Sequence, residues 1–105
     1  MTGTAKPSVA RGRPALLQAL DRIPSGRLTS PDRLARATGM KPLWVIRELT
    51  SLPDNVRDEV PWHRVVAEGG AVGRHARSRE QIARLRSEGV PVSPAGIIED
   101  AARRM

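Results

Sequence analysis

The sequence contains no cysteine, no phenylalanine and no tyrosine. Without cysteine, these residues cannot supply a disulfide, a cysteine-ligated zinc site or a thiol nucleophile. The core must be built from Leu, Val, Ile and Ala, which leaves Trp44 and Trp62 open to a role beyond packing. No apolar run approaches the length of a membrane span, and residues 1–10 lack the apolar segment of a signal peptide. We therefore expect a cytoplasmic protein, associated with the nucleoid if the source is prokaryotic.

Acidic residues are scarce in the first half of the chain. Residues 1–53 hold nine Lys or Arg against three Asp or Glu, residues 54–105 hold nine against eight, and the formal net charge is +7. A positive excess confined to half of a small chain indicates a polyanionic partner, bound through phosphate contacts and counterion release. No metal-ligand cluster and no Gly-rich phosphate loop is present, so we expect neither a cofactor nor an enzyme acting on nucleotides.

The chain of 105 residues has room for one domain. Residues 1–13 are rich in small and basic side chains and are predicted to form a flexible basic arm. Residues 14–90 carry the periodic apolar pattern of a folded domain. Residues 91–105 form a tail, in which residues 97–104 can make a short helix.

Three short helices are predicted in the first half of the chain. The first spans residues 15–22, and the second begins at Ser30, a favoured N-cap before a proline, and ends at Gly39. The third spans residues 43–52. Two short helices around a Gly-containing turn are typical of a helix-turn-helix, although a plain helical hairpin has the same pattern. Basic side chains around the turn favour DNA binding: Arg33, Arg36, Lys41 and Arg47.

The third helix is predicted to bury an apolar stripe made of Val45, Leu49 and Leu52, with Ile46 beside it. The stripe leaves Trp44 and Arg47 on the other side. An outward Trp beside an Arg on a recognition helix indicates a contact surface. The alternative is that Trp44 folds back against the next segment.

The second half of the chain has shorter elements. Residues 53–59 are predicted to form a polar loop, and residues 60–67 become extended at their end. A turn and a short strand follow in residues 68–73, then a basic loop in residues 74–79. A last helix begins at Ser78 or Arg79 and ends before a glycine. The predicted fold is therefore mainly α with a small β element, similar to a winged helix-turn-helix.

Residues 60–66, Val-Pro-Trp-His-Arg-Val-Val, resemble the active-site motif Pro-Cys-His-Arg-Val of the O6-alkylguanine-DNA alkyltransferases, with Trp62 at the place of the cysteine. Residues 23–29 resemble the family's entry to the helix-turn-helix. Residues 70–73 resemble its substrate loop, and residues 85–90 its closing helix. With this order and spacing, the chain resembles the alkyltransferase-like proteins, in which tryptophan replaces the catalytic cysteine.

The resemblance implies a non-enzymatic monomer that binds double-stranded DNA containing O6-alkylguanine. It implies docking of the helix-turn-helix in the minor groove, base flipping into a Trp-lined pocket, and flagging of the lesion for nucleotide excision repair proteins. The implied lesion pocket comprises Trp62, Val65, Arg74, His75 and Arg77, supported by Pro61, His63, Arg64 and Glu88. The implied DNA-binding residues are Ser30, Arg33, Lys41, Leu43, Trp44 and Arg47. The plainer alternatives are that Trp62 only packs the core and that the basic loop faces phosphates.

Two departures from the family pattern concern the flipping machinery. Pro31 stands where the family has a tyrosine that helps rotate the nucleotide, and Leu43 stands where it has an arginine that fills the vacated stack. We hypothesise that Leu43 or Trp44 acts as an apolar wedge, with Arg47 as the fallback. The alternative function is a winged-helix transcriptional regulator of undamaged DNA, which accounts for the charge and the hairpin but not for the motif at residues 60–66.

Overall fold

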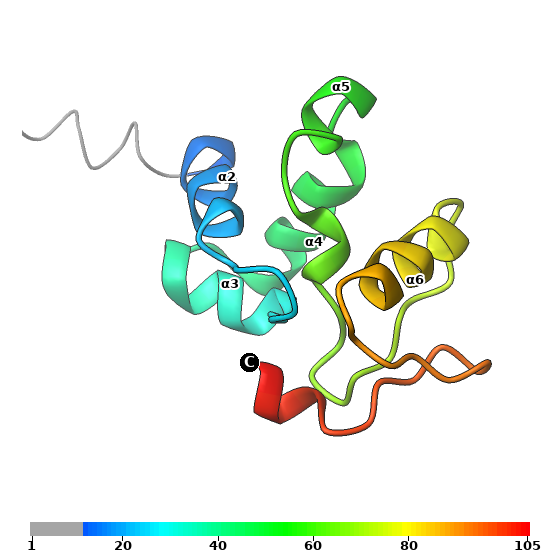
Figure 1. Cartoon of the computed structure of the whole chain (residues 1–105). Helices are drawn as coiled ribbons and strands as arrows, with labels where there is room; N and C mark the ends of the chain where they lie inside the picture. The colour runs from blue at the N-terminus through cyan, green and yellow to red at the C-terminus, as the bar shows by residue number, and fades with distance from the viewer. Residues whose placement is uncertain (1–11) are drawn as a thin grey trace, which may run out of the picture.

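Helices make up the regular structure of residues 12–105, which are the residues that the structure, a computed structural model, describes (Figure 1). Most of the predicted basic arm lies outside them. The elements are α2 (Arg13–Asp21), α3 (Pro31–Thr38), α4 (Pro42–Ser51), α5 (Asp54–Arg57), the 3-10 helix η1 (Trp62–Arg64), α6 (Ser78–Ser87) and the 3-10 helix η2 (Ala101–Arg104). None of the helices in this part of the chain is long and apolar enough to cross a membrane.

Helices α3 and α4 form the predicted helix-turn-helix, and α3 has the predicted caps. The Ser30 side chain accepts a hydrogen bond from the backbone N–H of Arg33 at 3.2 Å, and Pro31 occupies the first turn. At the other end Gly39 adopts a left-handed conformation with φ of 75°, and its N–H donates to the Ala35 carbonyl at 2.9 Å. These signals are local in sequence, which is why the bounds of α3 were predictable.

Two of the predicted helix bounds need correction. Helix α2 begins at Arg13, so the end of the predicted arm is helical, with Pro14 in the first turn. Residues 53–59 are not a simple loop, because they contain α5, which follows α4 directly. On α4 itself Val45 is fully buried as predicted, but Ile46 is 45% exposed.

Helix α6 ends in a Schellman motif, in which the N–H of Val90 donates to the Leu85 carbonyl at 3.0 Å and that of Gly89 donates to the Arg86 carbonyl at 3.0 Å. Its inward face carries Gln81 as well as Leu85. A buried glutamine in a small apolar core requires polar partners, and these belong to the site described below.

The β structure is smaller than predicted. Thr29 and Val65 form an isolated parallel bridge, and Ala71 and Ile97 form an antiparallel one. Neither bridge extends into a strand within residues 12–105, so the predicted small β element is reduced to two bridges and no strand hairpin forms a wing there. The first bridge ties the segment before α3 to the segment after η1.

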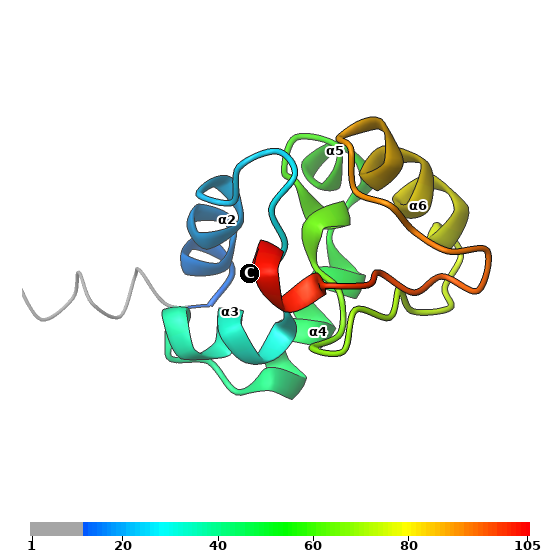
Figure 2. The same ribbon diagram turned by 60° about the horizontal axis from the view of Figure 1, so that its bottom comes forward.

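The tail packs into the protein, and its regular helix is limited to η2 rather than spanning residues 97–104. It runs past α6 and returns to the segment between α2 and α3 (Figure 2), where the N–H of Leu28 donates to the Arg104 carbonyl at 2.8 Å. Ile98 and Ala101 are buried in a second apolar cluster. Gly70 is required at this contact, since a Cβ there would lie 2.3 Å from the Ile98 carbonyl oxygen.

Candidate nucleic-acid interface

A largely apolar cavity of about 480 Å³ lies between α4, α5, η1 and the loop before α6. Four of the five predicted lesion-pocket residues line it: Trp62, Val65, His75 and Arg77. Pro31, at the start of α3, and Ile46 and Leu49, on α4, complete the side next to the helix-turn-helix. The cavity therefore opens beside the element that was predicted to bind DNA.

Trp62 forms one wall of this cavity but also belongs to the core. It is 8% exposed and packs in the apolar cluster that includes Leu16, Leu20 and Val45. The guanidinium of Arg77 lies over its ring, with Cζ 4.9 Å from the ring centroid. One face of the indole is therefore covered by Arg77 and is not open to the cavity. The same side chain both packs in the core and lines the cavity.

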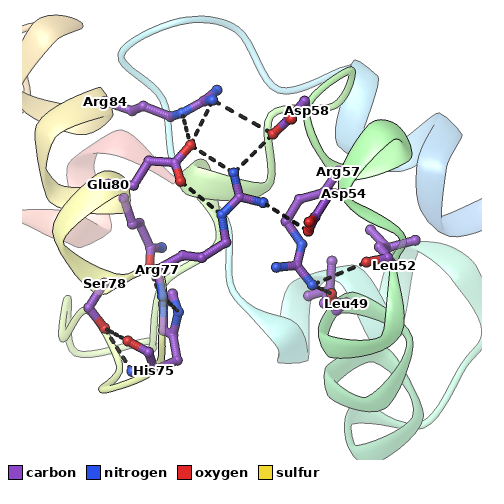
Figure 3. Close-up of polar contacts among 11 residues, drawn as sticks. Leu49, Leu52, Asp54, Arg57, Asp58, His75, Arg77, Ser78, Glu80 and Arg84 are labelled. Carbon is purple, nitrogen blue, oxygen red and sulfur yellow. Dashed lines mark hydrogen bonds and ion pairs between the residues drawn. The ribbon is translucent and has the colours of Figure 1, made fainter.

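Carboxylates from two helices hold Arg77 in this position (Figure 3). Glu80 accepts two hydrogen bonds from it, both at 2.8 Å, and Asp58 accepts a third at 2.9 Å. Asp54 lies 3.8 Å away. The hydrogen bonds to Glu80 and then to Asp58 raise the pKa of Arg77. A fork-shaped guanidinium with a bidentate partner is fixed in orientation, so Arg77 is a preformed part of the wall.

A hydrogen-bonded chain links the cavity loop to η1. The backbone N–H of Arg77 donates to Nδ1 of His75 at 3.1 Å, so Nε2 of His75 carries the proton that bonds Oε1 of Gln81 at 2.8 Å. The amide nitrogen of Gln81 donates to the carbonyls of His63 at 3.2 Å and Val65 at 2.9 Å. In this arrangement both ring nitrogens of His75 are hydrogen-bonded, and the side chain holds the loop.

The predicted supporting residues meet behind Trp62. Nε2 of His63 lies 2.6 Å from Glu88, and Arg64 donates to Glu88 at 2.7 Å and to the Ile23 carbonyl at 2.6 Å. Burial lowers the pKa of His63, although the hydrogen bond to Glu88 acts in the opposite direction. Burial alone would raise the pKa of Glu88, but the hydrogen bonds from Arg64, His63 and the Gly26 backbone outweigh it and lower that pKa to about 2. At neutral pH a neutral His63 thus donates to an ionised Glu88.

The start of α4 presents an apolar surface to solvent. Leu43 is 66% exposed and Trp44 is 51% exposed, so Trp44 does not fold back into the core. Arg47 stacks on the Trp44 ring, with Cζ 4.9 Å from the centroid. Lys41, the N-cap of the helix, is also exposed. Ile46, one turn further on, connects this surface to the cavity.

The start of α3 differs from the prediction. Ser30 is fully buried, and its hydroxyl donates to Glu68 at 3.1 Å while capping the helix. It is therefore a structural cap rather than a group free to contact DNA. Glu68 also accepts from Arg33 at 3.3 Å and lies 3.9 Å from Arg36. Arg33 and Arg36 remain exposed, but the carboxylate of Glu68 partly neutralises their charge.

Residues 13–90 match a family model described as the DNA-binding domain of 6-O-methylguanine DNA methyltransferase. The chain belongs to this family. It is also similar to two solved structures of S. pombe alkyltransferase-like protein. One, Atl1 in complex with damaged DNA containing O6-carboxymethylguanine, is 26% identical with a TM-score of 0.73 over 86% of this chain and 89% of that chain. The other, ATL in complex with DNA, is 25% identical with a TM-score of 0.75 over 88% and 91%. No curated protein matches the chain.

These matches confirm the predicted resemblance to the alkyltransferase-like proteins. One further pocket assignment needs correction: Arg74 is exposed and does not line the cavity, whereas His75 and Arg77 of the same loop do. The pairing of Arg77 with Glu80, three residues later on α6, is what draws it in.

Sequence reasoning missed several residues of the cavity wall, among them Ile46, Arg57 and Gln81. Gln81 had a usable signal, since it is a polar residue at the inward position one turn before Leu85. Arg57 had none, because the segment that carries it was assigned to a loop. Its position depends on how α5 folds back against the end of α4.

Proposed function

We propose that this protein binds double-stranded DNA containing O6-alkylated guanine and leaves the alkyl group in place. The observation that carries the proposal is a preformed cavity, walled by Trp62 and opening beside the exposed end of α4, in a member of a DNA-alkyltransferase family. Its volume of about 480 Å³ falls within the roughly 300–1,000 Å³ that is typical of small-molecule sites. The similarity to Atl1, solved with DNA containing O6-carboxymethylguanine, supports the same ligand class here.

The chemistry argues for binding without repair. Alkyl transfer in the family needs a thiolate, and these 105 residues contain no cysteine. Trp62, at the motif position, offers an indole without a low-energy route to a dealkylated product. His63, which would activate a thiol, is committed to Glu88. The pocket can therefore hold a modified base but has no acceptor for its alkyl group.

For docking, we propose that α3 and α4 lie along the minor groove and that the apolar start of α4 keeps the vacated base step open. Leu43 and Trp44 are the exposed side chains at that end, and Arg47 stiffens Trp44 by stacking on it. The flipped purine would then pass Ile46 and enter the cavity. Because Arg77 covers the indole, we expect the purine to meet the indole edge and the Arg77 guanidinium together.

The bound lesion would be presented to nucleotide excision repair proteins by a monomer in the cytoplasm. This part of the proposal rests on the family resemblance alone. A protein that recognises a lesion and cannot repair it requires a downstream enzyme, and a flipped, marked nucleotide is a suitable signal for one.

The test is a titration of matched duplexes containing guanine or O6-methylguanine, at two salt concentrations. The wild type is expected to prefer the modified duplex, and Trp62→Ala to lose most of that preference while keeping salt-sensitive background binding. Removing the apolar wall that the indole edge offers to the base should cost at least about 1 kcal/mol of contact, so the preference should fall by about fivefold or more.

Two controls make the titration decisive. Because Trp62 packs in the core, Trp62→Leu serves as a second variant that removes the aromatic ring but keeps more apolar volume than Trp62→Ala, and circular dichroism verifies that both variants are folded. Mass spectrometry after incubation should find no alkyl group on the protein. Equal affinity of the wild type for both duplexes, with dependence on base sequence instead, would identify a regulator of undamaged DNA.

A further inference from the structure

Arg57 is a positively charged residue of the cavity wall to which the proposed function assigns no role. Its Nη2 donates to three carbonyls at the end of α4, those of Leu49 at 3.4 Å, Thr50 at 3.2 Å and Leu52 at 3.3 Å. These bonds place the guanidinium at the negative end of the helix and fix its position (Figure 3). Within residues 12–105, neither Nε nor Nη1 of Arg57 has a hydrogen-bond acceptor.

The charges around Arg57 distinguish it from the other basic groups of the cavity. Arg77 is paired with Glu80, Asp58 and Asp54, and both ring nitrogens of His75 are already hydrogen-bonded. No carboxylate oxygen of the described part of the chain lies within 4.0 Å of the Arg57 guanidinium. Arg57 therefore contributes to this wall a guanidinium without a carboxylate partner, whereas the guanidinium of Arg77 is already paired.

We propose that Arg57 selects O6-substituents that carry an oxyanion, so that O6-carboxyalkylguanines are the preferred lesions of this protein. The proposal rests on the proposed function, which it deepens by naming the lesion class. A carboxylate that enters a partly dehydrated cavity loses water and needs charged donors in return. The N–H groups on Nε and Nη1 supply them, and the helix end holds the guanidinium in place before the lesion arrives.

The same chemistry could serve a phosphate of the DNA backbone, and the geometry favours the lesion. Arg57 lines the same cavity as Trp62 and Leu49, and it is half-buried there. A flipped base enters such a cavity, whereas the phosphates stay at its rim. The carboxylate on the base is thus the oxyanion that can reach Arg57.

The test uses duplexes that differ only in the target base: O6-methylguanine, O6-carboxymethylguanine and O6-carbamoylmethylguanine, the last being the uncharged amide isostere of the second. The wild type should bind the carboxymethyl duplex about tenfold more tightly than the carbamoylmethyl duplex, as expected for one hydrogen bond to a charged group. In Arg57→Gln the ratio should fall to about one, because glutamine keeps donors and loses the charge. Using the ratio within each variant removes any effect of Arg57→Gln on the folded fraction.

Arg86→Gln is the matched control. Arg86 also donates to a backbone carbonyl, that of Val92 at 2.7 Å, and its removal costs the same charge, but it does not line the cavity. The tenfold ratio should survive in Arg86→Gln. Arg57→Lys should retain part of the ratio, since the charge remains near the wall.

Four results would count against the idea in different ways. A wild-type ratio near one, or an unchanged ratio in Arg57→Gln, overturns the role of Arg57. An equal loss for all three duplexes in Arg57→Gln assigns Arg57 to a phosphate and also overturns it. A wild type that does not separate O6-methylguanine from guanine removes the proposed function itself, which distinguishes the two failures.

Discussion

Replacing Glu88 by glutamine tests whether the polar cluster behind Trp62 fixes the site to the helix-turn-helix. Glu88 accepts hydrogen bonds from Arg64 and His63 and from the backbone N–H of Gly26 at 3.1 Å. Its side chain is 13% exposed. Glutamine keeps the shape and removes the charge, so Arg64 loses its counterion in a poorly hydrated environment.

The magnitude follows from the pKa of Glu88, which folding lowers from 4.5 to about 2. At about 1.4 kcal/mol for each pKa unit, ionised Glu88 stabilises the fold by about 2–3 kcal/mol at neutral pH, the lower value allowing for solvent screening. Because the folded-state pKa is the lower one, this stability is present above about pH 4.5 and is lost as the pH falls towards 2. The lowered pKa of His63 adds a loss that begins as the pH falls below about 6.5.

Urea unfolding followed by circular dichroism, at pH values from 7 to 2, measures both effects. Glu88→Gln should lower the free energy of unfolding by about 2–3 kcal/mol at pH 7 and should flatten its dependence on pH below about 4.5. Glu99→Gln is the control, because Glu99 is exposed and should change stability by less than about 0.5 kcal/mol. If Glu88→Gln matches this control at pH 7, or keeps the wild-type slope in acid, the cluster does not stabilise the site as argued.

Two further predictions concern DNA affinity. Of the alanine variants at Leu43, Trp44 and Arg47, at least one of the first two should lose lesion affinity by about fivefold or more in duplex titrations, since about 1 kcal/mol or more is expected from a buried wedge. Equal small losses for all three would contradict the wedge. Glu68→Gln should raise affinity for damaged and undamaged duplexes alike by up to about fivefold and steepen the salt dependence, because it frees Arg33 and Arg36 to contact phosphates. An unchanged salt dependence would place these two arginines away from the DNA.

The sequence predicted those features that depend on near neighbours. Ser30 and Gly39 mark the ends of α3 by rules that act within four residues, and the structure places both as predicted. His63 and Glu88 were both assigned to the support of the pocket through the family resemblance, and they lie 2.6 Å apart. Local sequence rules do not predict such a long-range contact. Resemblance to a family predicts it because members of a family share a fold.

The features that were missed depend on contacts distant in sequence. Ser30 has an N-cap signal and a basic environment, but nothing local indicates that Glu68, 38 residues later, would cover it. The short helix α5 has four residues, too few to show a periodic pattern, and Arg57 owes its place to the carbonyls of α4. Arg74 and Arg77 are alike in sequence, and the contact that distinguishes Arg77 at long range is with Asp58, 19 residues earlier.

His63 and Glu88 stand at their motif positions although the chain has no cysteine for them to activate, and the structure gives a reason for their presence. Glu88 closes α6, His63 and Arg64 belong to η1, and Gly26 and Ile23 lie in the turn that leads to α3. One carboxylate therefore joins the cavity wall, the last helix and the entry to the helix-turn-helix. A groove-binding element and a base pocket must hold a fixed geometry if a nucleotide is to leave one and enter the other. His63 and Glu88 therefore serve as that fixed connection, a role that needs no thiol.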